Sequence, residues 1–182
     1  MSIQRFLLPL SLLMLLSIGL PTTGCTQAPA DRPQVTNKAF DKKVSGLLSF
    51  SVPTIGVDKL KDIKDEIFLF DTRQLEEYQV SHIEGARYLG YEDFDPKRLG
   101  ELPMDAPIVV YCSIGYRSEK IGEQLKEMGY TNVYNLYGSI FEWVNAGNPV
   151  VDEEGKPTNS VHTYNRKWSK WLEDTGEVNK VW

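Results

Sequence analysis

The sequence predicts an α/β fold: an open, mostly parallel sheet with helices on both faces, followed by a short C-terminal helical extension. The apolar run Ile67–Phe70 stands between Glu66 and Asp71, which is typical of a strand buried on both faces of a sheet. Such runs alternate with segments of helical periodicity, and this alternation favours right-handed parallel crossovers. The length of 182 residues suits one domain with further segments attached.

The first part of the predicted sheet begins at Val52–Ile55, a short strand whose proline confines it to an edge. A helical turn with Val57, Leu60 and Ile63 on one side follows, and it leads into the buried strand Ile67–Phe70. This order of elements places the second strand inside the sheet.

Asp71 is predicted to cap the next helix, with Gln74 three residues further on. Arg73 and Glu77 lie four residues apart on that helix, which indicates a solvated surface pair. The alternative is that Asp71 and Arg73, at the carboxyl end of a central strand, line a substrate crevice. We therefore count both as candidate substrate-binding residues.

The following segment contains His82 in a turn, the predicted strand Arg87–Leu89 and a short helix. Asp95 and Pro96 form an N-cap and a first helical residue, and the helix extends through Leu99. His82 is either a catalytic base or, as we expect of a single histidine in a turn, a hydrogen-bonded structural residue.

The candidate nucleophile is Cys112. The strand Ile108–Tyr111 ends there, a turn with Gly115 follows, and a helical pattern begins at Arg117 and Ser118. Free N–H groups at a helix start and the Arg117 cation both favour a thiolate. A pKa lowered from about 8.5 to about 6 would raise the thiolate fraction at pH 7 from about 3% to about 90%. The alternative is an inert buried cysteine.

The helix after Cys112 carries Ile121, Leu125 and Met128 on its buried side and stops at Gly129. The next strand is Val133–Leu136. A turn and a further helix then complete the predicted α/β unit.

That turn contains Gly138, and the helix after it carries Ile140 and Trp143. Near the C-terminus, Trp168 and Trp171 recur at helical spacing, which predicts a helix docked on the domain. The alternative is an aromatic platform for a partner or substrate.

Residues 1–24 have the features of a secretory signal peptide. Arg5 precedes the apolar run Phe6–Leu20, which is short for a membrane span and is followed by small residues. We therefore expect an exported protein.

The segment Leu20–Cys25 resembles a bacterial lipobox, in which the mature chain begins at a lipidated cysteine, here Cys25. Two or three acyl chains would hold the protein on the outer or periplasmic face of a bacterial membrane. Thr22 departs from the usual aliphatic residue, so cleavage by an ordinary signal peptidase, giving a soluble periplasmic or secreted protein, stays open. Residues 25–45 are predicted to be a tether.

The composition excludes several classes of function. The formal net charge is −5 and no basic stripe is present, so we expect no nucleic-acid partner. The sequence has no metal-ligand spacing. Of its two cysteines, Cys25 would be lipidated, which leaves Cys112 without an intramolecular disulfide partner.

Residues 46–152 resemble a single-domain rhodanese, a sulfurtransferase module, and residues 153–182 lie outside this resemblance. The resemblance rests on these segments: Asp71–Arg73 with Glu77 and Tyr78, His82–Ala86, Cys112–Ser118, Tyr137–Trp143, Ala146–Gly147 and Pro149–Val150. It implies a rhodanese-like sheet. Many thiosulfate-using members have arginine where this chain has Ser113, so the sulfur donor stays open.

The resemblance implies that Cys112 takes a sulfane sulfur from a donor such as thiosulfate or a persulfide. The resulting Cys112 persulfide passes the sulfur to a thiol or a cyanide-like acceptor, without a metal or an organic cofactor. Arg117 would be an additional catalytic cation and Ser118 the helix cap. The amides that cradle the sulfur would come from Ser113, Ile114, Gly115, Tyr116 and Arg117.

Two other functions remain open. A module of this fold could sense sulfur species or bind a partner without turnover. Some phosphatases also share the fold, but their loop is one residue longer than the six residues from Cys112 to Arg117. A phosphoryl group brings three further oxygens that need donors, so the shorter loop favours sulfur.

Overall fold

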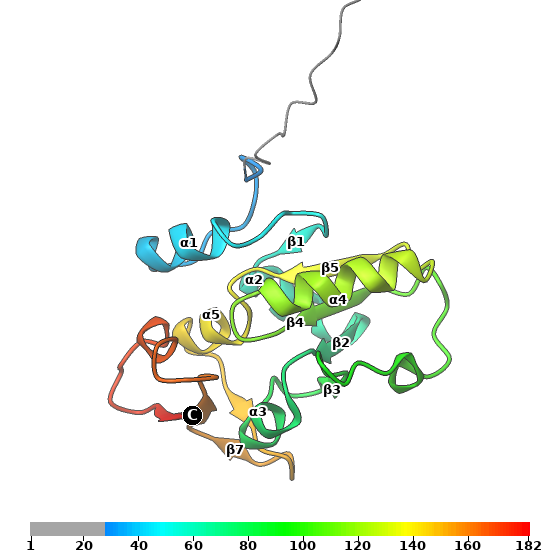
Figure 1. Ribbon diagram of the computed structural model, residues 1–182. Helices are drawn as coiled ribbons and strands as arrows, with labels where there is room; N and C mark the ends of the chain where they lie inside the picture. Colours follow the sequence, from blue (N-terminus) through cyan, green and yellow to red (C-terminus); the bar gives the residue numbers. More distant parts are fainter. Residues whose placement is uncertain (1–27) are drawn as a thin grey trace, which may run out of the picture.

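The computed structural model describes residues 28–182 and is built on a five-stranded sheet (Figure 1). Every neighbouring pair of strands is parallel, in the order β1-β5-β4-β2-β3. The strands are β1 (Thr54–Ile55), β2 (Phe68–Asp71), β3 (Arg87–Tyr88), β4 (Ile108–Tyr111) and β5 (Val133–Leu136). The predicted open parallel sheet is confirmed, and its first strand lies at an edge, with Pro53 directly before it.

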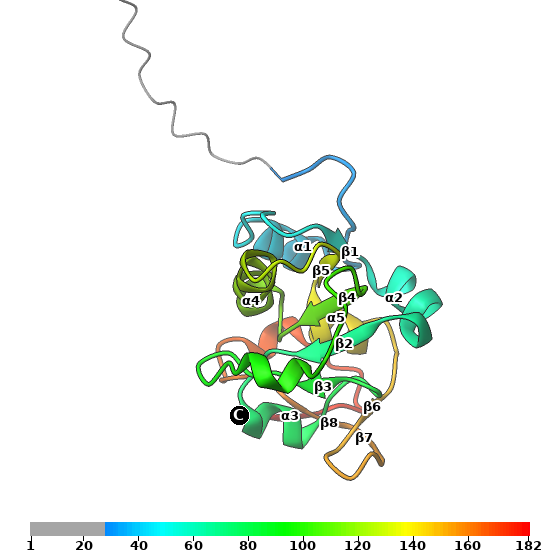
Figure 2. The same ribbon diagram turned by 90° about the vertical axis from the view of Figure 1, so that its right-hand side faces the viewer.

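Helices cover both faces of this sheet (Figure 2). On one face lie α1 (Lys38–Ser45), α2 (Val57–Ile63) and α5 (Ser139–Asn145). On the other face lie α4 (Tyr116–Glu127) and the 3₁₀ helix η2 (Pro96–Leu99). Two further short helices between the strands are η1 (Lys64–Glu66) and α3 (Leu75–Val80).

The alternation of side chains along β4 joins the two faces into one domain. Val109 and Tyr111 point into the core under α1, α2 and α5, whereas Ile108 and Val110 point into the core under α4. All four are fully buried. The central strand therefore has fixed surroundings on both sides and holds the residue that follows it in a defined place.

The N-terminal part of the domain differs from the prediction. The segment expected to be a tether contains α1, which Asn37 caps by accepting hydrogen bonds from the N–H groups of Ala39 and Phe40. Phe40 and Val44 are buried in the core, so this part of the chain belongs to the folded domain. The predicted signal peptide and Cys25 lie outside the described residues.

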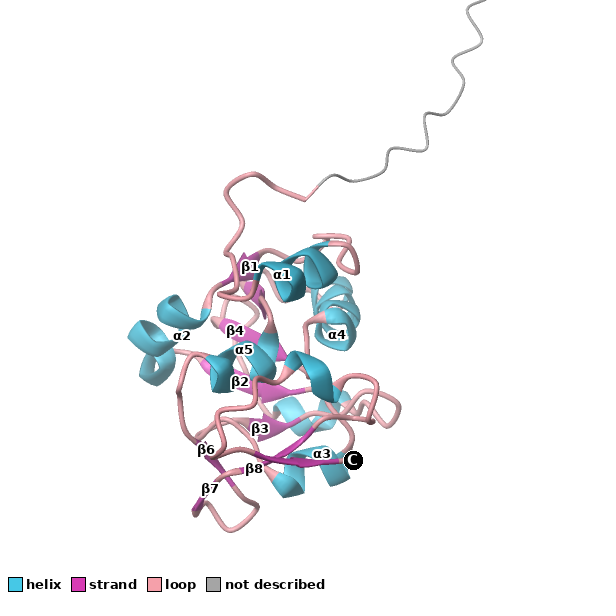
Figure 3. Ribbon diagram, turned by 90° about the vertical axis from the view of Figure 1, so that its left-hand side faces the viewer, coloured by secondary structure: helices cyan, strands magenta, loops and turns pink. Residues whose placement is uncertain are grey.

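The predicted C-terminal helix is wrong. Beyond α5 the chain forms β6 (Val150–Val151) paired with β7 (Pro157–Thr158), and β8 (Ser160–His162) paired with β9 (Asn179–Val181) (Figure 3). Its one helical piece is the 3₁₀ helix η3 (Ser169–Trp171).

A single 3₁₀ turn satisfies the aromatic spacing that suggested a longer helix. Leu172 is already extended and is 1% exposed. The ring of Trp171 stacks on Phe40 of α1 with centroids 5.6 Å apart. The expected docking on the domain is therefore confirmed, although the segment is not an α-helix.

Helix α4 ends one residue before the predicted last contact. Met128 is 41% exposed and does not reach the core, whereas Ile121 and Leu125 are fully buried. Gly129 follows with a φ of 103° and stops the helix as predicted. Among residues 28–182, none of the helices has the length and apolar character needed to cross a bilayer.

Candidate active site

Cys112 directly follows β4 and lies where that strand meets the start of α4. Its side chain is 1% exposed and forms part of the wall of a cavity of about 370 Å³. The residues lining this cavity are Leu47, Gln74, Tyr91, Glu92, Cys112, Ser113, Ile114, Tyr116, Arg117, Tyr164 and Trp168. The structure thus places five of the predicted site residues, Cys112, Ser113, Ile114, Tyr116 and Arg117, around one hollow.

The loop after Cys112 turns its amides toward the sulfur. Gly115 has a φ of 117°, which favours glycine, and its N–H lies 3.1 Å from Cys112 Sγ. The Gly115 carbonyl faces the other way, where it accepts a hydrogen bond of 2.9 Å from Asn135 Nδ2. This conformation gives the loop its anion-binding side.

The electrostatic surroundings favour a thiolate. Burial alone would raise the pKa of the Cys112 thiol, but the charge of Arg117 and the backbone N–H groups of Ser118, Ile114 and Gly115 outweigh it. The pKa of Cys112 is therefore lowered from its ordinary value, as the position at a helix start predicts.

Arg117 is held by an acidic residue that the sequence did not connect with it. Glu77 on α3 accepts hydrogen bonds from Arg117 Nη1 at 2.6 Å and Nη2 at 2.8 Å, and from the Ser113 hydroxyl at 3.0 Å. Burial would raise the pKa of Glu77, but the bonds and charge of Arg117 keep it below the usual range. The predicted surface pair of Arg73 with Glu77 is therefore wrong.

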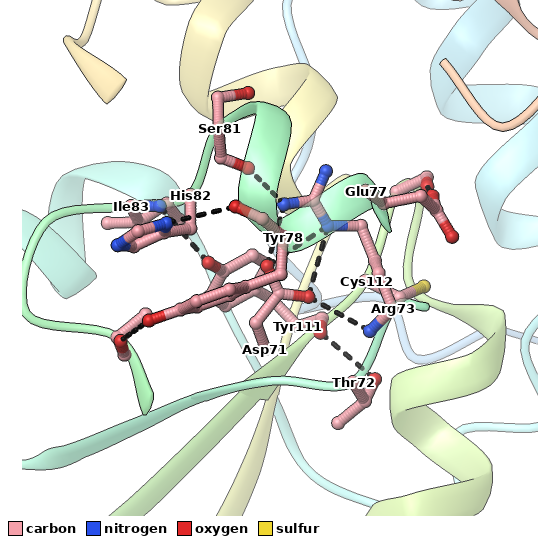
Figure 4. A network of polar contacts seen from close by, with 12 residues as sticks. Asp71, Thr72, Arg73, Glu77, Tyr78, Ser81, His82, Ile83, Tyr111 and Cys112 are labelled. Carbon is pink, nitrogen blue, oxygen red and sulfur yellow. Dashed lines mark hydrogen bonds and ion pairs between the residues drawn. The ribbon is translucent and has the colours of Figure 1, made fainter. Parts of the chain in front are cut away.

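Arg73 pairs instead with Asp71, and both side chains are fully buried (Figure 4). The Arg73 guanidinium donates to Asp71 Oδ2 at 2.6 Å and to the carbonyl of Ser81. Neither residue lines the cavity. Their predicted substrate-binding role is not supported by this geometry, because the pair joins the end of β2 to the turn after α3.

The predicted Asp71 cap is likewise wrong. Gln74 is the N-cap of α3, and its N–H donates to the Glu77 carboxylate at 3.1 Å. Because Asp71 is bound to Arg73, it is not available to the first turn of the helix.

His82 has the structural role that we expected. It is 7% exposed, its ring stacks on Tyr78 with centroids 3.9 Å apart, and its Nδ1 lies 3.1 Å from the Tyr78 carbonyl. Figure 4 shows the imidazole away from the sulfur of Cys112, and it does not line the cavity.

Ser118 is not the cap of α4, because the N-cap is Gly115. Its hydroxyl is buried, donates to Asn135 Oδ1 at 2.7 Å and also lies 3.1 Å from the Gly115 carbonyl. Ser118 therefore acts on the site through its backbone N–H and by fixing the loop.

Ser139 is a site residue that sequence reasoning missed. Its Oγ accepts a hydrogen bond of 3.1 Å from the Cys112 N–H and donates one of 3.1 Å to the Leu136 carbonyl. Its φ is 53°, which is uncommon for a residue with a side chain. The only sequence signal was a serine directly after Gly138, in a turn predicted between a strand and a helix.

A family model for the rhodanese-like domain matches residues 56–146. The chain belongs to the rhodanese-like domain family. The match ends before the C-terminal extension and begins after α1, so the rhodanese domain carries a further segment on each side.

Curated relatives agree with this assignment. The chain is 36% identical over 97 residues to a sulfurtransferase of Allochromatium vinosum, covering 53% of this chain and 89% of that protein. It is 33% identical over 87 residues to the thiosulfate sulfurtransferase GlpE of Actinobacillus succinogenes, covering 48% and 78%. A putative sulfur carrier protein of Bacillus subtilis, YrkF, is 29% identical over 96 residues, and the match spans 51% of each chain.

Solved structures share the fold. The rhodanese-like domain of an Anabaena protein has a TM-score of 0.51 at 23% identity, over 55% of this chain and 79% of that one. A Bacillus halodurans protein has a TM-score of 0.51 at 22% identity, over 65% and 88%. Together, the family and its named relatives support sulfur transfer as the general activity of this rhodanese domain.

Proposed function

We propose that this rhodanese domain is a sulfurtransferase that works through a persulfide on Cys112. The observation that carries the proposal is the loop itself: the Gly115 N–H lies 3.1 Å from Cys112 Sγ, and the neighbouring amides and Arg117 lower the pKa of the thiol. A ring of donors of this size suits one additional sulfur atom that carries negative charge.

The reaction has two steps. The Cys112 thiolate attacks the outer sulfur of a donor, the S–S bond of the donor breaks, and the rest of the donor leaves as sulfite from thiosulfate or as a thiolate from a persulfide. An acceptor thiolate then attacks the outer sulfur of the Cys112 persulfide, which releases the Cys112 thiolate and forms a new persulfide. With cyanide as the acceptor the product is thiocyanate. The protein returns to its starting state.

The test is mass spectrometry after incubation with thiosulfate and, separately, with an organic persulfide, followed by addition of cyanide. We expect one added sulfur atom on Cys112 and its loss as thiocyanate, with no transfer by the Cys112→Ser variant. A stable persulfide that no acceptor removes would instead indicate a sulfur-sensing or carrier module. Equal turnover by Cys112→Ser would place the chemistry elsewhere.

We also propose that the protein is exported and anchored to a membrane by lipidation at Cys25, preceded by a signal peptide over residues 1–24. The support is the apolar run and the lipobox-like segment of the sequence. The test is fractionation of cells: wild-type protein should sediment with membranes, whereas Cys25→Ala should not. Wild-type protein in the soluble extracytoplasmic fraction would show cleavage by an ordinary signal peptidase.

A further inference from the structure

The wall of the Cys112 cavity is built partly by chain outside the rhodanese-like match. Leu47 follows α1, and Tyr164 and Trp168 lie in the C-terminal extension, whereas the family match covers residues 56–146. These three apolar or aromatic side chains line the cavity together with residues of the Cys112 loop. The two added segments therefore shape the space in front of the thiol.

Tyr164 and Trp168 form what we call the aromatic wall of the cavity. Hydrogen bonds within the C-terminal extension fix the segment that carries both rings. The buried Thr163 donates its N–H to the Val181 carbonyl at 2.7 Å, next to Tyr164. Tyr164 itself has a φ of 63°. The N–H of Trp168 donates to the Asn165 carbonyl at 3.1 Å. The two rings are thus attached to an ordered segment.

The positive charge of Arg117 is already paired before a substrate enters. The Arg117 guanidinium is bound by both oxygens of Glu77, and its carbon lies 5.1 Å from the centroid of the Tyr164 ring. Ser113 also donates its hydroxyl to Glu77. Glu92 adds a further carboxylate to the wall. Among the side chains that line the cavity, an added anion would therefore meet one cation that is paired and one acid that is not; Lys43 lies behind this lining, with its Nζ 5.4 Å from the Trp168 ring, and the loop amides point to the sulfur of Cys112.

The cavity is also larger than sulfur transfer to a small ion requires. Its volume is about 370 Å³, whereas one water-sized atom needs roughly 10–15 Å³ by this kind of measure. Cavities of this size and apolar character hold small organic molecules. Space for an organic body therefore lies between the thiol and the aromatic wall.

We propose that this wall selects an uncharged organosulfur co-substrate, a thiol or persulfide with an apolar body, over anionic ones. The inference rests on the proposed sulfurtransferase function and names the substrate class of the same site. In the donor step the S–S bond of an apolar persulfide breaks, its outer sulfur bonds to Cys112 Sγ, and the apolar thiolate leaves. In the acceptor step an apolar thiolate takes that sulfur and is released as a persulfide. Neither step needs an external oxidant or reductant.

The experiment compares two acceptors of nearly the same size and shape that differ in charge, 4-(mercaptomethyl)benzamide and 4-(mercaptomethyl)benzoate, with the persulfide on Cys112 formed beforehand. We expect kcat/KM for the uncharged thiol to exceed that for the carboxylate by about tenfold or more, because the cation that lines the cavity, Arg117, is already paired with Glu77. Equal use of the two thiols would overturn the proposal.

Variants of Tyr164 and Trp168 test whether the aromatic wall causes the preference for the uncharged thiol. Tyr164→Asn removes the ring but tolerates the positive φ, and we expect it to bring the ratio of the two kcat/KM values close to one, as we expect of Trp168→Ala. Tyr164→Phe should keep the preference. Trp182→Ala, which removes another exposed aromatic ring of the extension, is the matched control and should also keep it. A ratio that no wall variant alters would assign selection to other residues.

A second readout does not depend on sulfur transfer. The alkylation rates of Cys112 by 4-(bromomethyl)benzamide and 4-(bromomethyl)benzoate, each divided by its rate with free cysteine, should show the same preference and the same loss in Tyr164→Asn. If selective alkylation is found without any Cys112 persulfide, the cavity inference holds and the proposed function fails. If a persulfide forms and neither readout is selective, the proposed function holds and this inference fails.

Discussion

The residues around Cys112 determine how reactive its thiol is. Burial opposes ionisation, and Arg117 and three loop amides favour it strongly enough to lower the pKa. Glu77 limits this effect because it neutralises part of the Arg117 charge while it fixes the guanidinium. Glu77 thus makes the Cys112 thiol somewhat less acidic and, at the same time, fixes the position of the Arg117 guanidinium.

Alkylation of Cys112 should therefore be fast at pH values below those at which an ordinary thiol ionises. The rate should rise with pH to a midpoint below about 8.5, since the thiolate is the reactive form. In Arg117→Ala the midpoint should move up, because the largest favourable charge is gone while the loop amides remain. Iodoacetamide labelling against pH, with Cys112→Ser as the blank for Cys25, measures both. Equal midpoints in wild type and Arg117→Ala would show that Arg117 has no electrostatic role.

Single residues also show where reading the sequence fails. Cys112 and its loop were predictable, because a strand, a turn and a helix start follow one another within a few positions. The partner of Arg117 was not, because Glu77 is 40 residues away in the chain and local spacing pointed to Arg73. Spacing along one helix cannot tell whether a side chain turns to a neighbour on that helix or across the sheet.

At the scale of elements, the turn from β5 into α5 supports the turn from β4 into α4. Ser139 at the start of α5 accepts the hydrogen bond of the Cys112 N–H, and the Ile140 N–H lies 3.2 Å from the Cys112 carbonyl. Two neighbouring parallel strands thus end in loops that fix each other. The sulfur is positioned by this contact as well as by its own loop.

Ser139 substitutions should separate the hydrogen bond from backbone strain. Ser139→Ala and Ser139→Gly both leave the buried Cys112 N–H without its acceptor, which costs about 1–3 kcal/mol, and both should slow sulfur transfer. Only glycine adopts the φ of 53° freely, so Ser139→Gly should be the more stable variant by about 1 kcal/mol. Chemical denaturation and the cyanide assay on both proteins check this. Wild-type transfer rates in both variants would mean that the bond does not position the thiol.

Loop length should decide between sulfur and phosphate. The six residues from Cys112 to Arg117 close a small ring of amides, which leaves the oxygens of a phosphoryl group short of donors. An unpaired charged oxygen in such a site costs several kcal/mol, or several powers of ten in rate. We expect sulfur transfer without hydrolysis of aryl phosphates, measured on one preparation with Cys112→Ser as the blank. Cys112-dependent phosphate release faster than thiocyanate formation would contradict the assignment.

Element by element, the core of the fold was predictable and its ends were not. The inner strands β2 and β4 follow from apolar runs between polar boundaries, which directly reflect burial in a parallel sheet. The extension after β6 consists of two- and three-residue strands and one 3₁₀ turn. Pieces this short have no periodicity of their own, and their conformation comes from the surface on which they pack.

At the scale of the whole molecule, the segments before and after the rhodanese-like match pack against the same helix, α5. Phe40 of α1 stacks on Trp171, and Asn145 of α5 donates to the Trp171 carbonyl at 2.9 Å. Thr36, just before α1, donates its N–H at 2.9 Å to Glu142 of α5. These contacts attach both added segments to one helix of the rhodanese domain.

Ionisation of Glu142 should lower the free energy of unfolding as pH rises, whereas ionisation of an ion-paired acid raises it. Burial raises its pKa, and its second oxygen is buried without a hydrogen-bond partner. Because the pKa is higher in the folded protein, the ionised carboxylate destabilises the fold fully above the folded pKa. This destabilisation is absent below the unfolded value of about 4.5. Glu142→Gln should therefore unfold with a larger free energy than wild type at pH 8, and the difference should vanish near pH 4.

The control is Glu127→Gln, which changes an exposed carboxylate at the end of α4. Denaturant unfolding of the three proteins between pH 4 and pH 8 gives the comparison. A difference between Glu142→Gln and wild type that is constant with pH would mean that the carboxylate is solvated and that only the shape of the side chain matters.

The placement of Trp168 has an optical consequence. The chain has four tryptophans, and among residues 28–182 Trp168 is the one that lines the cavity, with Lys43 Nζ 5.4 Å from its ring. A molecule that enters the cavity displaces water from this indole and alters the electric field that the Lys43 ammonium exerts on it. The protein thus contains its own fluorophore for occupancy of the site, so that binding can be followed by emission without a label and separately from the chemical step.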